Sequence, residues 1–212
     1  MFLFGNKRKK NQLKLEVSGL EFANPLGSTS WSANASFIVT TPPKDNVIDW
    51  ISSIKSKYPG QIVALDISED IQRNFSLSYD FAGFLIINPD HAGGINAMDI
   101  SDIVNMLDSL LSLRLCYEKY TPVYLRISKA VTPEELKTLI SYCRLSGIDG
   151  IVAQGLHNVQ YIKELSQGRM PVIGATSDAQ EAITMLSEGA SLVELSASSI
   201  VLKKTLKTLE QQ

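Results

Sequence analysis

Two charged side chains at the ends of apolar runs are the first candidates for chemistry. Asp66 lies near the end of the run Ile62–Ser68, and Arg126 lies within the run Val123–Ser128. If both runs are strands of one parallel barrel, the two side chains reach the carboxyl-end face, where barrel active sites assemble. Three interpretations stay open: a structural ion pair in a collapsed site, a ligand-binding carboxylate at Asp66, and a solvated loop carboxylate.

A second candidate is the aspartate–histidine pair in the segment 90–94 (DHAGG). An imidazole next to a carboxylate can act as an acid–base pair near neutral pH, although a loop histidine is more often simply exposed. Gly93-Gly94 is too short and too isolated to indicate a phosphate-binding loop. The chain has only two histidines, which excludes a site built from several histidines, and we expect no metal.

The two cysteines, Cys116 and Cys143, fall among apolar neighbours in helical patterns. We interpret both as core thiols, which suits a reducing, cytoplasmic compartment; a reactive pair is the alternative. No apolar run approaches the ~20 residues that span a bilayer. A net charge of −2 gives no reason to expect a nucleic-acid partner.

The order of the remaining elements predicts an α/β barrel. Apolar runs alternate with capped helical patterns, as in the βαβ units of a parallel sheet, and near-continuous apolar runs are typical of strands covered by helices. Capping signals stand at 132–135 and 177–180. The predicted strands are 25–30, 36–41, 62–68, 83–89, 123–128, 150–154, 171–176 and 192–197; the predicted helices are 46–58, 157–166, 198–209 and those beginning near 99, 133 and 178.

Eight such strands favour a closed TIM-type (βα)8 barrel over an open sheet, in a single domain over residues 13–212. Residues 1–12, with four basic residues at 7–10, are expected to be a flexible tail; a weak contact with an anionic surface is the alternative. The chain is short for this fold, which usually takes ~250 residues.

The shortage lies between the first two strands, where only the segment 31–35 (WSANA) intervenes. A parallel crossover usually takes a dozen or more residues. We therefore expect the first helix to be missing and the wall to be gapped, distorted or antiparallel there. Trp31 is expected to fill the space as a core residue, and a subunit partner to cover the apolar surface that is left.

Several segments resemble dihydroorotate dehydrogenases, in the order in which that family has them. Residues 15–27 (LEVSGLEFANPLG) are similar to its LEVxGLxFxNPxG hairpin, and 123–136 (VYLRISKAVTPEEL) to its fifth-strand segment. Residues 147–152 (GIDGIV) are similar to GxDGI, and 171–195 to PVIGxGGIxSxxDAxExIxAGASxVQL. The resemblance implies a barrel with a small N-terminal β-hairpin, FMN as the cofactor, and dihydroorotate oxidation in pyrimidine biosynthesis as the reaction.

The residues at the family's site positions depart from the family. Arg126 stands where a lysine holds the flavin, and Asn88 stands where a serine or cysteine is the base. An amide cannot accept a proton as a base, so the resemblance leaves no catalytic residue. Leu85 and Asp90 replace asparagines that bind the substrate. The positions that match flavin contacts are Gly27, Ser28, Asp66, Asn88, Arg126, Gln154, Gly174, Ala175, Ser196 and Ala197.

The phosphate half of such a site depends on backbone amides and survives side-chain changes. Small residues at 174–176 and 196–199 follow the last two strands, and free amides at a helix N-terminus attract anions. Ala175 in place of a glycine weighs against this arrangement. Glu194 is expected to face outward or sideways, because an inward carboxylate would repel the anion.

Three classes of function remain. The substitutions favour a barrel that has lost dehydrogenase catalysis and acts as a binding or partner module. The alternatives are an FMN-dependent oxidoreductase of altered substrate and a phosphate-ligand-binding barrel enzyme of the isomerase or synthase kind. The candidate partners are a phosphate-bearing small molecule and a second copy of the chain.

Overall fold

Eight parallel strands close into a barrel in the computed structural model, which describes residues 13–58, 60–89, 99–127 and 131–211. The ring runs β10-β3-β4-β5-β6-β7-β8-β9. Its strands are β3 (Leu26–Ser28), β4 (Phe37–Thr40), β5 (Ile62–Ile67), β6 (Phe84–Ile87), β7 (Val123–Ile127), β8 (Gly150–Gln154), β9 (Val172–Thr176) and β10 (Leu192–Leu195). The predicted TIM-type fold is confirmed.

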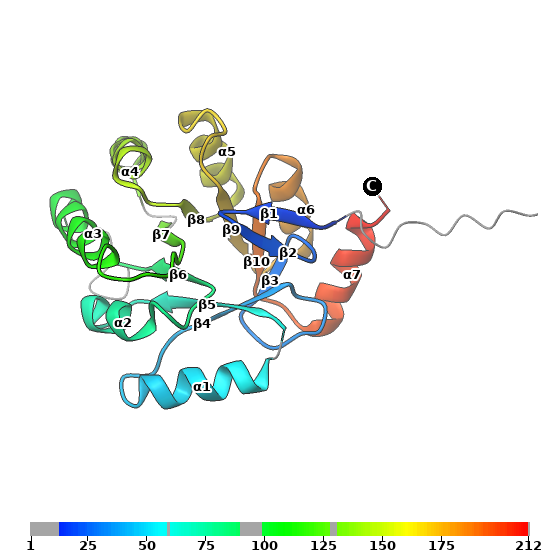
Figure 1. Ribbon diagram of the computed structural model, residues 1–212. Helices are drawn as coiled ribbons and strands as arrows, with labels where there is room; N and C mark the ends of the chain where they lie inside the picture. The colour runs from blue at the N-terminus through cyan, green and yellow to red at the C-terminus, as the bar shows by residue number, and fades with distance from the viewer. Residues whose placement is uncertain (1–12, 59, 90–98, 128–130, 212) are drawn as a thin grey trace, which may run out of the picture.

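Helices surround the barrel from α1 round to α7 (Figure 1). They are α1 (Val47–Lys57), α2 (Ile71–Ser78), α3 (Ile100–Arg114), α4 (Pro133–Ser146), α5 (Leu156–Leu165), α6 (Ala179–Ser187) and α7 (Ser199–Leu209). None of the helices within the described ranges has both the length and the hydropathy to cross a bilayer. The predicted basic tail, residues 1–12, lies outside the described residues.

Strand alternation divides the apolar residues into two layers. In β6, Phe84 and Ile86 belong to the cluster inside the barrel, whereas Leu85 and Ile87 belong to the larger cluster under the helices. Successive strand residues point to opposite faces, so the parity of a position decides which layer its side chain enters. This parity also determines which polar residues reach the barrel interior.

A β-hairpin covers one end of the barrel, as predicted. It consists of β1 (Leu15–Val17) and β2 (Leu20–Phe22), joined through Ser18 and Gly19, both of which have positive φ (50° and 76°) as two-residue hairpin turns require. Val17 and Phe22 belong to the interior cluster. The hydroxyls of Ser18 and Tyr124 are 2.7 Å apart and share a hydrogen bond. The amino-end mouth of the barrel is therefore closed.

The connection from β3 to β4, residues 29–36, contains no helix, which confirms the predicted loss of the first helix. The expected gap or antiparallel pairing is wrong, because β3 pairs in parallel with both neighbours, over two positions on each side. Trp31 was expected in the core but is 56% exposed. The loop passes over the outside of the barrel, between α7 and α1 (Figure 1).

Three further expectations need correction. Helix α2 was not predicted, since its buried residues Asn74 and Ser78 are polar and blur the apolar periodicity. The first residue of the cap before α6 is Asp178 and not Ser177: the Asp178 side chain accepts a hydrogen bond from the amide of Glu181. Cys143 is buried as expected, but Cys116 is exposed, because it follows the end of α3.

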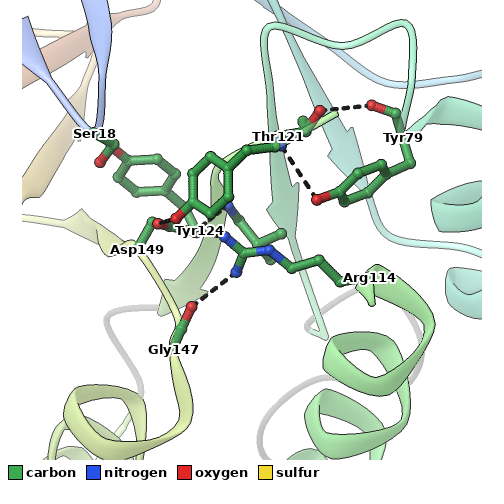
Figure 2. Close-up of polar contacts among 9 residues, drawn as sticks. Ser18, Tyr79, Arg114, Thr121, Tyr124, Gly147 and Asp149 are labelled. Atoms are coloured by element: carbon green, nitrogen blue, oxygen red, sulfur yellow. Dashed lines mark hydrogen bonds and ion pairs between the residues drawn. The ribbon is translucent and has the colours of Figure 1, made fainter. Parts of the chain in front are cut away.

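A polar network fastens the elements around the start of β7 (Figure 2). Arg114, at the end of α3, forms a 3.1 Å ion pair with Asp149 and donates a 2.9 Å hydrogen bond to the carbonyl of Gly147. Asp149 also accepts from the amide of Val123 at 2.8 Å. The Tyr79 hydroxyl accepts from the amide of Thr121. These contacts tie α3 to the segment before β8 and stabilise the amino-end face.

Candidate functional site

A buried ion triad occupies the carboxyl-end mouth of the barrel. Nη2 of Arg126 is 2.7 Å from Oδ2 of Asp66 and 2.8 Å from Oε2 of Glu194. All three residues are buried: their exposed fractions are 5%, 9% and 6%. The predicted pairing of Asp66 with Arg126 is confirmed. The expectation that Glu194 faces outward or sideways is wrong.

Strand parity explains why these three side chains meet. Ala64 is inside the barrel, so Asp66 two residues later on β5 is inside as well. The same relation holds for Tyr124 and Arg126 on β7, and for Leu192 and Glu194 on β10. A charge is buried only when it is paired. The inward carboxylate of Glu194 is therefore accommodated by the guanidinium, which also serves Asp66.

Burial and the two carboxylates act in opposite directions on Arg126. Desolvation is the larger single influence and lowers the pKa of the guanidinium, but the charges of Glu194 and Asp66 together outweigh it and raise the pKa. Arg126 is therefore positively charged at neutral pH. Two buried atoms of the triad, Oδ1 of Asp66 and Nε of Arg126, have no hydrogen-bond partner in the described part of the chain.

A cavity of about 300 Å³ lies beside the triad at the ends of β7–β10. It combines one guanidinium with the carboxylates of Asp178, Glu181 and Glu194. The remaining lining groups are an amide, hydroxyls and a methyl group, from Gln154, Thr176, Ser177, Ser196 and Ala175. The wall of the cavity is therefore polar, and among the described lining residues three carboxylates face one cationic side chain, that of Arg126.

The helix N-termini next to this cavity already have acceptors. The amide of Leu156, at the start of α5, donates to Oε1 of Glu181 (3.2 Å), and the amide of Glu181 donates to Asp178 (2.7 Å). The amide of Val201 in α7 donates to the Ser198 hydroxyl (3.4 Å). Anion sites at helix N-termini depend on free amides. Side chains occupy these amides here.

The loops that would carry a site on this face are short. Only Gly155 separates β8 from α5, only residues 177–178 separate β9 from α6, and residues 196–198 separate β10 from α7. Barrel enzymes build their active sites from these βα loops. The longer connection after β6 includes residues 90–98, so the predicted Asp90-His91 pair lies outside the described residues.

The sequence-predicted site residues fall into two groups. Arg126, Gln154, Ala175 and Ser196 line the cavity, and Asp66 contacts Arg126 behind it. The other five have different surroundings and are not among the lining residues: Gly27, Ser28, Asn88, Gly174 and Ala197.

The two glycines of that second group serve packing. A Cβ on Gly27 would lie 2.2 Å from the ring of Phe37, and a Cβ on Gly174 would lie 2.5 Å from Sδ of Met185. Ser28 is fully buried, and its hydroxyl accepts a hydrogen bond from the amide of Ser30. A side chain at either position would therefore clash with a packed neighbour, which accounts for both glycines without a ligand.

Sequence reasoning missed Ser177, Asp178 and Glu181 as lining residues and expected Glu194 to face away, whereas Thr176 lies in the predicted segment 174–176. Asp178 lies in the predicted capping signal at 177–180, which indicates only the start of a helix, and Glu181 directly follows that signal. Thr176 and Glu181 hydrogen-bond through their side chains. Their position in the sequence could have identified them, because a helix cap that directly follows a barrel strand lies at the carboxyl-end face of the barrel.

The site does not fit FMN. A phosphate monoester carries about −1.5 to −2 charge at neutral pH, and the cavity presents three carboxylates against a guanidinium that two carboxylates already contact. One first-turn amide of each of α5, α6 and α7 donates to a side chain, and the amides of Ser196 and Ala197 donate to the backbone carbonyls of Thr176 and Leu195. No group of three or more His, Cys, Asp or Glu residues suited to a metal is found within the described residues.

Comparisons with known proteins agree with the fold. No family model matches the chain. A curated relative, the dihydroorotate dehydrogenase (quinone) of Aeromonas hydrophila, is 25% identical; the match covers 55% of this chain and 46% of the relative. The chain thus spans about half the length of that relative. 

Two solved structures share the fold of this chain. The dihydroorotate dehydrogenase (DHODH) of Eimeria tenella in complex with ferulenol superposes with a TM-score of 0.78 at 14% identity, over 97% of this chain and 85% of the other. The ligand-free form gives 0.76 at 13% identity, over 97% and 87%. The chain is a divergent, dihydroorotate-dehydrogenase-like barrel.

Proposed function

We propose that this divergent, dihydroorotate-dehydrogenase-like barrel has lost dehydrogenase catalysis and acts as a binding or partner module. The observation that carries the proposal is the Arg126 triad, in which Asp66 and Glu194 occupy the guanidinium at the mouth of the barrel. The basic group that would meet a flavin thus already forms ion pairs with two carboxylates of the protein. The loops that build active sites on this face are also reduced to one to three residues after β8, β9 and β10.

Asn88 supports the same proposal. It directly follows β6, and it holds the place that the family resemblance gives to the catalytic base. Its backbone amide donates to the carbonyl of Ile67. A carboxamide does not titrate in the accessible pH range and cannot take the proton that leaves as hydride moves to a flavin. The lost base and the occupied guanidinium are independent obstacles to the reaction.

The test is an assay of dihydroorotate oxidation with added FMN, using a quinone, fumarate or NAD as the acceptor. We expect no turnover above background and no flavin absorption band in the purified protein. An N88S or N88C variant, which restores a residue type that the family resemblance gives to the base, is expected to remain inactive because the Arg126 guanidinium is still paired with two carboxylates. Turnover of the parent protein at an ordinary enzymatic rate, ~1–10³ s⁻¹, contradicts the proposal.

The polar lining of the cavity supports a role in binding a small polar molecule.

The outer surface near the β3–β4 loop supports self-association. Trp31 is 56% and Ile200 69% exposed, and a 3.2 Å hydrogen bond between the hydroxyls of Ser32 and Ser199 holds their segments together. Both lie where the first helix is missing. We propose a homo-oligomer through this patch in a cytoplasmic setting, which suits two free cysteines. Light scattering of the parent and of a W31S/I200S variant tests it: a parent that is monomeric at high concentration refutes self-association.

A further inference from the structure

We infer that Glu194 is the residue that closes the mouth cavity to phosphate-bearing ligands. The inference deepens the proposed function, since it takes the cavity as a binding site and names the side chain that sets its ligand class. It concerns inorganic phosphate and phosphate monoesters, which share one chemistry. The cavity of the parent protein is left to uncharged or cationic polar molecules.

The first step of the argument is how the Arg126 guanidinium is used. Both of its ion pairs involve the same nitrogen, Nη2, which has two hydrogens and meets one carboxylate oxygen with each. Two carboxylates within 3 Å of a single guanidinium give the triad a net negative charge. An anion that approaches Arg126 from the cavity therefore meets more negative than positive charge at short range, where Coulomb interactions are strongest.

The second step separates Glu194 from Asp66. Glu194 lines the cavity, whereas Asp66 contacts Arg126 without being part of the cavity lining. Removing the charge of Glu194 would leave the Arg126–Asp66 pair, which is neutral and keeps the guanidinium partnered. It would also release one hydrogen of Nη2 toward the cavity. Removing the charge of Asp66 would leave the Glu194 carboxylate between Arg126 and any incoming anion.

The third step separates Glu194 from the other lining carboxylates. Both oxygens of Glu181 are used away from Arg126, by the amide of Leu156 and the hydroxyl of Thr176. Asp178 caps α6 through the amide of Glu181. These two carboxylates contribute charge, but in the described residues they make no contact with the guanidinium. Among the described lining carboxylates, that of Glu194 is the one that contacts Nη2 of Arg126.

The experiment is a titration with inorganic phosphate, followed by calorimetry and by ³¹P NMR, on four proteins at equal ionic strength. They are the parent chain, E194Q, E181Q and the double variant R126M/E194Q. E194Q is nearly isosteric and removes one charge. E181Q removes one charge from the same cavity without freeing Arg126, so it is the matched control.

We expect no phosphate binding by the parent and by E181Q up to millimolar concentration. E194Q is expected to bind at least tenfold more tightly than E181Q, and R126M/E194Q is expected to lose that gain. If E194Q is unfolded by circular dichroism, E194S takes its place, since a smaller neutral side chain equally frees the guanidinium.

Three outcomes overturn the inference: phosphate binding by the parent, equal binding by E194Q and E181Q, or no binding by folded E194Q and E194S. These outcomes are distinct from failure of the proposed function, which would be dihydroorotate turnover by the parent protein. A parent that neither turns over dihydroorotate nor binds phosphate, together with phosphate binding by E194Q alone, supports both.

Discussion

A buried guanidinium shared by two buried carboxylates is a residue-scale feature with a consequence for stability. Arg126 balances Asp66 and Glu194, and all three are buried. Removing one member of a buried ion cluster leaves an uncompensated charge, which typically costs about 3–5 kcal/mol. The Arg126→Met variant is expected to lose that much free energy of unfolding, as measured by urea denaturation. The matched triple variant R126M/D66N/E194Q is expected to recover most of the loss; a single variant within 1 kcal/mol of the parent contradicts the prediction.

The two cysteines give a second residue-scale prediction. Burial raises the pKa of the Cys143 thiol to about 12, whereas Cys116 is exposed. Because the thiolate is the nucleophile, a disulfide reagent at pH 8 is expected to modify Cys116 quickly and Cys143 only after unfolding. The stoichiometry of labelling should be one per native chain and two in denaturant. A C116S variant is the control and should show no fast phase; fast labelling of C116S would show that Cys143 is accessible.

The triad also shows how far sequence reasoning reaches for single residues. Asp66 and Arg126 could be placed together because each lies toward the carboxyl end of a predicted parallel strand, and these ends meet at one face of a barrel. The anion hypothesis predicts that Glu194 faces outward, whereas the alternation of Leu192, Val193 and Glu194 places it inside the barrel. Its partner could not be known without the three-dimensional register. A usable signal was nonetheless present: Glu194 replaces a glutamine in the resembled VQL motif, so a charge has been added at an inward position.

At the scale of elements, Gln61 compensates for the missing first helix. Its Nε2 donates to the carbonyls of Ser32 (2.7 Å) and Ala35 (3.0 Å), which fastens the β3–β4 loop to the start of β5. The Gln61→Ala variant leaves both carbonyls without this donor. We expect a loss of about 1–3 kcal/mol and faster amide hydrogen exchange in residues 29–36, measured by mass spectrometry. Gln72→Ala, on the exposed side of α2, is the control and should change neither quantity.

Element prediction succeeded where hydrophobic pattern and capping agree, as in α4, whose Thr132–Glu135 capping box is present. It failed for α2, which buries Asn74 and Ser78 alongside Ile71 and Phe75. Asn74 donates to the carbonyl of Glu69, so a polar residue takes a core position through a local hydrogen bond. Such a contact depends on the folded backbone and leaves no trace in hydropathy. The wall at β3 was misjudged for a related reason, because Gln61 holds a loop that length alone appears to forbid.

At the scale of the whole molecule, buried acids that stay neutral make stability fall at alkaline pH. Desolvation raises the pKa of Cys143 from 9.0 to about 12 and also raises the pKa of Tyr124. The unfolded chain ionises first, so the stabilisation is complete below about pH 9 and is lost as the pH rises toward 12. The free energy of unfolding is expected to decline by up to about 1.4 kcal/mol per pH unit for a single such group.

Urea denaturation at pH 8, 9, 10 and 11 measures this decline. A C143A variant, whatever its absolute stability, should show a shallower dependence on pH because it has no thiol to ionise. A flat profile for the parent up to pH 11, or identical slopes for parent and variant, contradicts the assignment. The exposed Cys116 makes C116A a suitable control with an unchanged slope.

Because β3 and β10 close the barrel, one strand edge stays unpaired while the chain between them is being synthesised. Leu26 near the start of the chain pairs with Val193 near its end. A ribosome that adds ~5–20 residues per second needs on the order of ten seconds or more to make the second partner after the first. During that interval the nascent chain carries an open sheet whose β3 edge has backbone donors and acceptors without a neighbour, which is the kind of edge that recruits other chains. By pairing with β3, β10 therefore covers a strand edge that has been open since β3 was made.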